Sequence, residues 1–283
     1  RPVCKLMTEP LHQNINEQKA ELSEKQWQKL KEYLPPQKPE TGRPAEDHRK
    51  IINGILWKVR TGAPWRDIPE RYGPWATIYS RFRRWRDAGV WGRILSELQA
   101  ESDSEGHVDW TIHFVDTTVV RAHQHAAGAK KGGSEQRLLA VVEGFSTKVH
   151  LRAEGEGKPI TLALTPGQAH DTTEFLDLME HGAIKRPHGG RPRIRPDRLV
   201  GDKGFSAQWI RDYLAKHGIH VTIPRKSNNK RGGPFDREAY RMRNRIERLI
   251  NRLKQFRSIA TRYDKRADSY LSMWLIGAII LWL

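Results

Sequence analysis

The sequence contains almost no cysteine. Cys4 is the single one in 283 residues, so the chain has no internal disulfide framework and no cluster of thiolates that could hold zinc. Proteins that do without disulfides are typical of reducing compartments. A small secreted scaffold and a zinc-finger protein are therefore excluded.

Long hydrophobic runs are also lacking. The first twenty residues contain no apolar run, which argues against a secretory signal. The final stretch, YLSMWLIGAIILWL, is apolar but shorter than the roughly 20 residues needed to cross a bilayer. We expect a buried terminal helix there and no membrane partner. The chain begins with Arg1, and Met7 is the nearest candidate initiator.

Acidic residues are scarce relative to basic ones. The chain has 33 Asp and Glu against 50 Lys and Arg, which gives a formal net charge of +17. A balance this positive favours a polyanion as the partner, and nucleic acid is the commonest polyanion in cells. Hydrophobic residues still make up 37% of the chain, enough to bury a core.

The first hundred residues have the periodicity of helices. Residues 1–21 are polar and aperiodic and are expected to be a flexible tail, whereas residues 22–100 predict a small helical DNA-binding domain. Helices about 45–60 and 75–88 are separated by Gly/Pro turns, an order similar to a helix-turn-helix. Arg81 and Arg84 on the second of these helices are the candidate DNA contacts. An ordinary helical bundle with a solvated basic face explains the same spacing equally well.

After the acidic segment 101–107 the periodicity becomes that of strands. The pattern predicts an α/β domain over residues 108–283, with three consecutive antiparallel strands followed by alternating helices and strands. The expected strands are 111–121, 138–154, 159–165, 198–201 and 220–224, and the expected helices are 171–181, 206–217 with Ser206 as its N-cap, and 235–265.

Residues 235–265 are expected to form one long helix with three sectors. An apolar stripe is wide enough to be buried, and a row of arginines lies on the far side. Between them, at 100° per residue, Tyr240, Arg243, Glu247 and Lys254 fall in one arc of roughly 60°. Glu247 is thus the single carboxylate in a narrow polar seam. Ion pairing with Arg243 one turn away is the ordinary explanation for such a residue.

Two aspartates lie where the sites of α/β sheets usually form. Asp116 interrupts the apolar run of the first strand, and Asp202 follows the fourth strand in LVGDKGF. Each has an ordinary alternative, because Asp116 could pair with Arg121 and Asp-Lys-Gly is a common turn.

The three carboxylates are more informative together. If Asp116, Asp202 and Glu247 meet at one edge of the sheet, their charges repel one another unless cations bind between them. Hard oxygen ligands select Mg²⁺ or Mn²⁺. A pair of such ions is the arrangement that serves phosphoryl transfer. Three carboxylates that converge in this way could therefore hold such a pair of ions.

These motifs resemble those of a known family. Tyr240-x-x-Arg243-x-x-x-Glu247-x-x-x-x-x-x-Lys254 is similar to the signature of the DDE transposases of bacterial insertion sequences, in the insertion-sequence-five family of the wider insertion-sequence-four-like superfamily. FVDTTVVRAHQHAAGAKKG and VGDKGF resemble the segments that carry its two aspartates, and GRPAEDHRKIINGILWKVRTGAPWRDIPERYGPWATIYSRFRRW resembles its N-terminal domain.

The resemblance implies an RNase H-like (retroviral-integrase-like) catalytic domain with a mixed sheet, behind a small all-α helix-turn-helix-like domain. It implies Mg²⁺-dependent cleavage at an element's terminal inverted repeats and strand transfer into target DNA, with Mn²⁺ as a substitute ion. It implies that Asp116, Asp202 and Glu247 are the catalytic residues that hold the metal ions. Tyr240, Arg243 and Lys254 would bind DNA near the scissile phosphate. A homodimer on DNA and a cytoplasmic, nucleoid-associated location in bacteria are implied as well.

Two other functions stay open at this point. A metal-dependent nuclease would cut without joining, and a transposase-derived regulator would bind DNA without cutting. A histidine-ligated metal at His123, His125 and His170 is the third alternative, but their spacing matches no metal motif.

Overall fold

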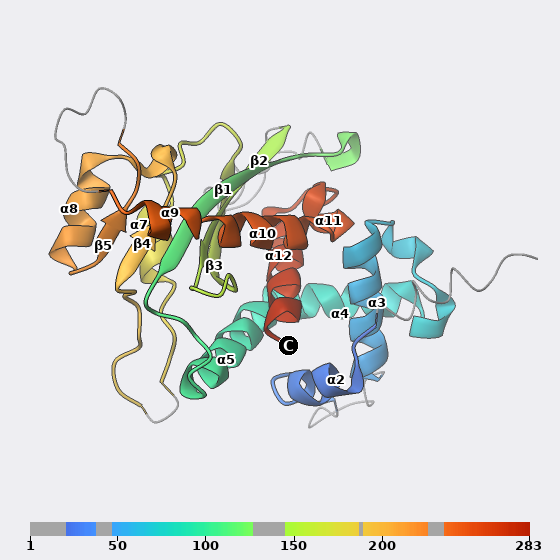
Figure 1. The fold of residues 1–283 in the computed structure, drawn as a ribbon. Coiled ribbons are helices and arrows are strands. Elements are labelled where there is room, and N and C mark those ends of the chain that lie inside the picture. Colours follow the sequence, from blue (N-terminus) through green and yellow to red (C-terminus); the bar gives the residue numbers. More distant parts are fainter. Residues whose placement is uncertain (1–20, 38–46, 127–144, 187–188, 226–234) are drawn as a thin grey trace, which may run out of the picture.

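The computed structural model describes residues 21–37, 47–126, 145–186, 189–225 and 235–283 (Figure 1). The strands are β1 (His113–Arg121), β2 (Ser146–Ala153), β3 (Pro159–Pro166), β4 (Arg198–Val200) and β5 (His220–Thr222). The α-helices are α2 (Glu24–Lys31), α3 (His48–Thr61), α4 (Trp75–Asp87), α5 (Val90–Ser104), α7 (Phe175–Glu180), α8 (Gln208–Lys216), α9 (Arg237–Arg241), α10 (Asn244–Lys254), α11 (Arg257–Ala260) and α12 (Ala267–Trp282). Four short 3₁₀ helices are η1 (Trp65–Asp67), η2 (Glu70–Tyr72), η3 (Gln124–Ala126) and η4 (Lys203–Phe205).

The five strands form one mixed sheet in the order β3-β2-β1-β4-β5. The strands β1, β2 and β3 pair antiparallel, and β4 pairs parallel with β1 and with β5. The expected meander and the mixed α/β sheet of an RNase H-like fold are confirmed. Residues 138–144, which were predicted to open the second strand, lie outside the described part of the chain, as does most of the predicted tail.

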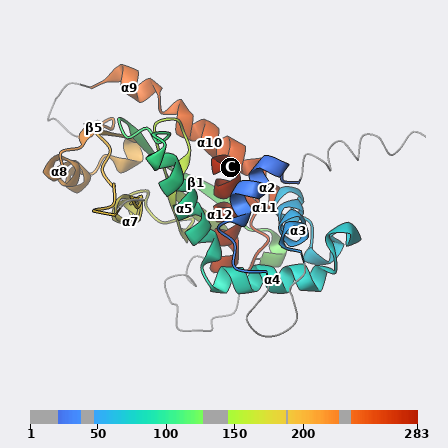
Figure 2. The ribbon, with the colours of Figure 1, turned by 90° about the horizontal axis from the view of Figure 1, so that it is seen from below.

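Alternate residues of β1 belong to different layers of the molecule. Val115 packs with α7 and α8 in one hydrophobic cluster, whereas Phe114 and Val120 pack with α10 and α12 in another. Figure 2 shows α7 and α8 toward one end and α2, α3 and α4 toward the other. Because side chains of a strand alternate between its faces, neighbouring residues at the middle of β1 meet different helices.

The N-terminal region of the described chain is entirely helical, as predicted. Asp47 caps α3 by accepting a hydrogen bond from the N–H of Arg49, and Gly62 ends the helix with φ 70°. Two short 3₁₀ helices separate α3 from α4, which gives the predicted order of helix, turns and basic helix. Helix α5 was not predicted, and it runs into the acidic segment 101–107.

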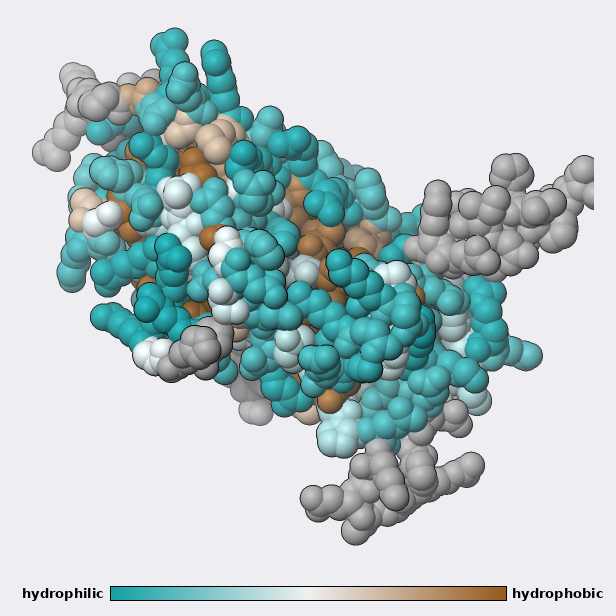
Figure 3. All heavy atoms as spheres, turned by 60° about the horizontal axis from the view of Figure 1, so that its bottom comes forward, coloured by the Kyte–Doolittle hydropathy of each residue, from teal (hydrophilic) through white to brown (hydrophobic). Residues whose placement is uncertain are grey.

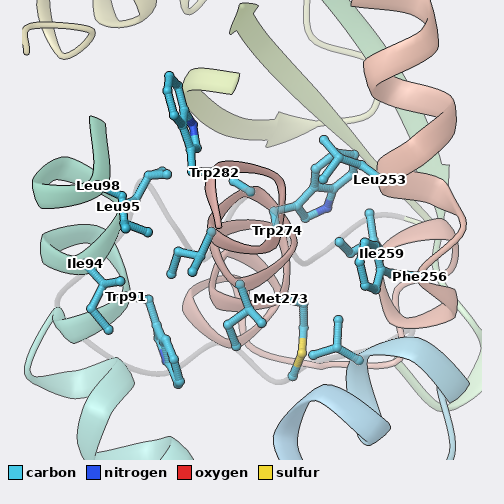
Figure 4. Close-up of a cluster of buried hydrophobic side chains, with 14 of the residues drawn as sticks. Trp91, Ile94, Leu95, Leu98, Leu253, Phe256, Ile259, Met273, Trp274 and Trp282 are labelled. Atoms are coloured by element: carbon cyan, nitrogen blue, oxygen red, sulfur yellow. The ribbon is translucent and has the colours of Figure 1, made fainter. Parts of the chain in front are cut away.

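Helix α12 holds the helical region and the sheet together. It is apolar on all sides, and Trp274 in its centre is fully buried. Figure 4 shows side chains of α5 and of the α10–α11 region packed around it. The indole N–H of Trp282 donates to the carbonyl oxygen of Pro159 on β3 at 2.8 Å. The predicted buried terminal helix is confirmed, and the described residues include no helix long and apolar enough to cross a membrane.

In contrast to the apolar interior around α12, the surface is rich in polar and charged side chains. Figure 3 displays a face that is mostly hydrophilic, with apolar patches between the polar side chains. The heavily ionised composition of the chain is thus accommodated at the surface, while Trp85, Trp110 and Trp274 are among the aromatic residues buried in the interior.

Two predictions about helices were wrong in detail. Residues 235–265 form three helices, because the backbone tightens at Met242 and Arg243, where N–H groups bond three residues back, and becomes extended at Phe256. Helix α8 begins after Ala207, whose side chain cannot cap it, while Ser206 lies one residue too early.

Candidate active site

The sheet register brings the two aspartates to the same level. Phe114 on β1 pairs with Val200 on the parallel strand β4. Asp116 lies two residues beyond Phe114, and Asp202 lies two residues beyond Val200. Adjacent parallel strands advance equally per residue, so the two side chains emerge side by side at the carboxyl end of β4, where ligands of α/β sheets usually bind.

Arg243 joins Asp116 to Glu247. Its guanidinium donates to Oδ2 of Asp116 at 2.9 Å and also forms an ion pair with Glu247 one turn along α10. The other oxygen of Asp116 accepts the N–H of Thr117 at 2.8 Å. The anticipated alternative pairing of Asp116 with Arg121 does not occur, whereas the expected pairing of Glu247 with Arg243 does.

Negative charge is concentrated around Asp116. Burial raises the pKa of Asp116 to about 6, although the N–H of Thr117 and the guanidinium of Arg243 act in the opposite direction. The charges of Asp202 and Glu247 add to the increase, so all three predicted carboxylates act on one another electrostatically. Arg243 contributes one positive charge beside these three carboxylates.

Asp202 is held by the loop that follows it. Its Oδ1 accepts the N–H of Gly204 at 2.8 Å and so caps the short helix η4. A side chain at position 204 would collide with the carboxylates of Asp171 and Asp202. Glycine in the sequence DKGF therefore lets the backbone approach both acids closely, and a larger residue there would make their carboxylates shift.

The remaining residues of the predicted seam border the same site. Lys254 donates to Oγ1 of Thr118 at 2.6 Å, and Thr118 lies on the same face of β1 as Asp116. The ring of Tyr240 lies 5.9 Å from the guanidinium carbon of Arg243. The long predicted helix is interrupted at Arg243, but the backbone angles of Arg243 remain those of a right-handed helix. The polar residues of the predicted seam therefore still lie along one side of this segment.

The two candidate DNA contacts of the helical region lie apart from the carboxylates, on α4. Arg81 is half-buried, with its guanidinium 3.4 Å from the imidazole of His48 and 5.6 Å from the ring of Trp85. Arg84 is exposed and bonds Ser80 one turn away. Arg84 is therefore the more accessible of the two.

Four polar residues around the site, Thr117, Thr118, Lys148 and Asp171, were not anticipated as functional. Asp171 accepts hydrogen bonds from Thr117 and Lys148, each at 2.8 Å, and Thr118 orients Lys254. Asp171 follows His170, which was considered only as a ligand of the alternative metal site. Only the pairing of β1 with β2 and the fold of the loop after β3 bring these side chains together, so no local signal could have identified them.

The histidines of the alternative metal site make other contacts. The ring of His123 stacks on those of His125 and Tyr263, and His170 bonds the hydroxyl of Thr172. No three histidine, cysteine or acidic side chains within the described residues are arranged to hold a metal ion as they stand.

The chemistry of the carboxylate site nevertheless fits a divalent ion. Asp116, Asp202 and Glu247 offer the hard oxygen ligands that Mg²⁺ and Mn²⁺ prefer. The guanidinium of Arg243 lies between two of them and supplies positive charge at that point. A metal ion would compete with Arg243 for the oxygens of Asp116 and Glu247.

Two family models match this chain. Residues 22–95 match the family described as "Putative transposase of IS4/5 family", and residues 111–283 match "Transposase DDE domain". The uncharacterized protein y4sN of Sinorhizobium fredii is 37% identical over 43% of this chain and 94% of its own. A putative transposase for insertion sequence element IS6501 of Brucella ovis is 25% identical over 49% of this chain and 99% of its own.

Among solved structures, the Mos1 transposase paired-end complex with the left transposon end matches at 12% identity and a TM-score of 0.26, covering 80% of this chain and 82% of that one. A similarity with so low a TM-score does not establish a shared fold or function. The match that decides is the DDE domain, which spans more than half of the sequence and contains all three carboxylates. The chain belongs to the DDE transposases of the insertion-sequence-four and -five type.

Proposed function

We propose that this protein binds the terminal inverted repeats of an insertion element and catalyses metal-dependent DNA cleavage and strand transfer, acting as a homodimer on DNA. One observation supports this proposal above all: Asp116 on β1 and Glu247 on the distant helix α10 both pair with the guanidinium of Arg243. Asp202 is also close enough for its charge to raise the pKa of Asp116.

Asp116, Asp202 and Glu247 would hold two Mg²⁺ ions, and Mn²⁺ would substitute for them. When bound, such ions neutralise charge on the scissile phosphate and lower the pKa of an attacking hydroxyl or water. In cleavage, a water oxygen bonds to phosphorus as the bond to the 3′-oxygen breaks. In strand transfer, that 3′-hydroxyl bonds to a target phosphorus, and the target's own 3′-oxygen leaves.

The cations of the seam would bind the DNA backbone. The planar guanidinium of Arg243 suits a two-point contact with a phosphate, Lys254 provides a point charge, and Tyr240 offers a ring on which a displaced base can stack. Arg243 already contacts two of the carboxylates. A phosphate that attracts this guanidinium would therefore also free the carboxylates to accept metal.

The helical region would supply binding to the element's ends. Arg84, exposed on α4, is the main candidate there, and the half-buried Arg81 is the second. The excess of basic over acidic residues in the whole chain supports a nucleic acid as the partner.

The test uses a labelled duplex taken from the end of the native element, with Mg²⁺ and a target plasmid. We expect nicked and joined products from the wild type. Glu247→Gln should reduce both by on the order of 10³-fold while the affinity for DNA stays unchanged. Glu238→Gln, at an exposed position on the neighbouring helix α9, is the matched control and should behave as the wild type.

The other outcomes separate the alternatives. Nicks without joined products would favour a nuclease, and bound but uncut DNA would favour a regulator. Full cleavage by Glu247→Gln would show that Glu247 is not part of the catalytic site.

A further inference from the structure

A fourth acid, Asp171, lies directly behind the proposed site. Its Oδ1 accepts hydrogen bonds from the hydroxyl of Thr117 and the ammonium of Lys148, both at 2.8 Å. Thr117 follows Asp116 in β1 but faces the opposite layer, because side chains alternate along a strand. Asp171 therefore contacts the strand of Asp116 from the side covered by α7.

The second oxygen of Asp171 faces the loop that carries Asp202. A Cβ placed on Gly204 would overlap Oδ2 of Asp171 and would come within 2.9 Å of Oδ1 of Asp202. The N–H of the same glycine donates to Oδ1 of Asp202 at 2.8 Å. The carboxylate of Asp171 is thus packed against the piece of backbone that orients Asp202.

The charge of Asp171 is locally balanced. The side chain of Lys148 is only 12% exposed and also donates to the carbonyl oxygen of Ala169 in the same loop. Burial alone would raise the pKa of Asp171, but the hydrogen bonds from Lys148 and Thr117 outweigh it and leave the pKa below its usual value. Asp171 is therefore ionised and already paired, which favours a geometric role over that of a metal ligand.

We infer that Asp171 is a positioning residue, which clamps the backbone at Gly204 against β1 so that Asp202 stays level with Asp116. The inference rests on the proposed function, in which these two aspartates share metal ions. Residues that orient metal ligands typically change metal affinity or activity by about 10–100-fold when they are replaced.

The first test measures Mn²⁺ binding by the full-length protein on duplex DNA, with free Mn²⁺ followed by electron paramagnetic resonance. Asp171→Ala should weaken binding about 10–100-fold. Asp171→Asn should stay within about threefold of the wild type, since the amide fills the same space and its oxygen accepts both hydrogen bonds. Wild-type affinity in Asp171→Ala would overturn the inference. So would equal losses in Asp171→Ala and Asp171→Asn, because charge would then matter more than shape.

A second test uses the collision at Gly204. Gly204→Ala should weaken Mn²⁺ binding as well, because the new methyl group displaces both carboxylates. The double variant Asp171→Ala/Gly204→Ala should lose less than the sum of the two single losses in free energy, since removal of the Asp171 carboxylate makes room for the methyl group. Simple additivity would contradict direct contact between these positions.

Thr117→Val provides a variant that keeps the fold if Asp171→Ala does not. It removes one hydrogen bond to Asp171 at nearly constant volume, and we expect a loss of about threefold in Mn²⁺ affinity at an unchanged melting temperature. Unchanged affinity would overturn the inference. If the wild type and Glu247→Gln both failed to bind Mn²⁺, the proposed function itself would fail, which is a different result from metal binding that is insensitive to position 171.

Discussion

The two faces of strand β1 differ in their charged residues: one face carries a proposed catalytic acid, and the other packs against a paired acid and lysine. On the face toward α10, Asp116 is one of three carboxylates, and Arg243 compensates for them only in part. On the face toward α7, Thr117 meets an acid that Lys148 neutralises fully. The face that carries the proposed metal ligands has an excess of negative charge, whereas the acid on the other face is paired with a lysine.

The largest expected effect is an opposite response of the two faces to pH. Burial raises the pKa of Asp116 from 3.8 to about 6, so between these values the folded state binds a proton more tightly than the unfolded state. Stability from this group is lost as pH rises through that window. Asp116→Asn does not titrate, so in chelator its stability relative to the wild type should increase by about 1–3 kcal/mol from pH 4 to pH 7 in urea unfolding.

His150, which pairs with Thr117 across β1 and β2, should show the reverse. Burial lowers the pKa of His150 from 6.5 to about 4, so the ring stays neutral when folded. The unfolded chain takes up the proton first, and stability is lost as pH falls from about 6.5 to about 4. The stability of His150→Gln relative to the wild type should therefore increase toward low pH. If the stabilities of Asp116→Asn and His150→Gln relative to the wild type changed in the same direction with pH, the contrast between the two faces of β1 would be contradicted.

A smaller effect concerns the cation between the carboxylates. Arg243→Gln removes the positive charge that competes with metal, so Mn²⁺ should bind the DNA-free protein about tenfold more tightly, as measured by calorimetry. Arg248→Gln, on the exposed side of α10 and bonded only weakly to Asn244, is the matched control and should leave the affinity unchanged. Weaker Mn²⁺ binding by Arg243→Gln would show that the guanidinium orients the carboxylates instead of competing with metal.

The smallest expected effect is a difference between Lys254 and Lys148 in their contribution to DNA binding. Lys254→Met, on the α10 face, should weaken DNA binding by a few-fold and reduce the slope of log affinity against log salt by about 1, because one phosphate contact is lost. Lys148→Met, on the α7 face, should leave both the DNA affinity and the slope unchanged. Equal effects of the two substitutions in a salt titration by fluorescence anisotropy would show that DNA binding does not distinguish the faces.

Local signals were sufficient for much of the fold. Alternation in FVDTTVV and PITLALT predicted β1 and β3, and Gly and Pro residues marked the end of α3 and the start of α4. The break at Met242 and Arg243 carries no such signal, because neither residue disfavours a helix. Ser206 is a good N-cap by type, yet the chain is still turning there and the helix begins two residues later.

The sequence by itself determined which acids belong to the seam and to the strands, because helical and strand spacing are properties of the backbone. It also determined the basic character of the protein and the burial of its last helix. Only the tertiary structure decided that Asp116 meets Arg243 and that Asp171 lies against Gly204, through which it supports Asp202. Those contacts join residues far apart in the chain, and no local pattern specifies which distant partner a side chain meets once the sheet has closed.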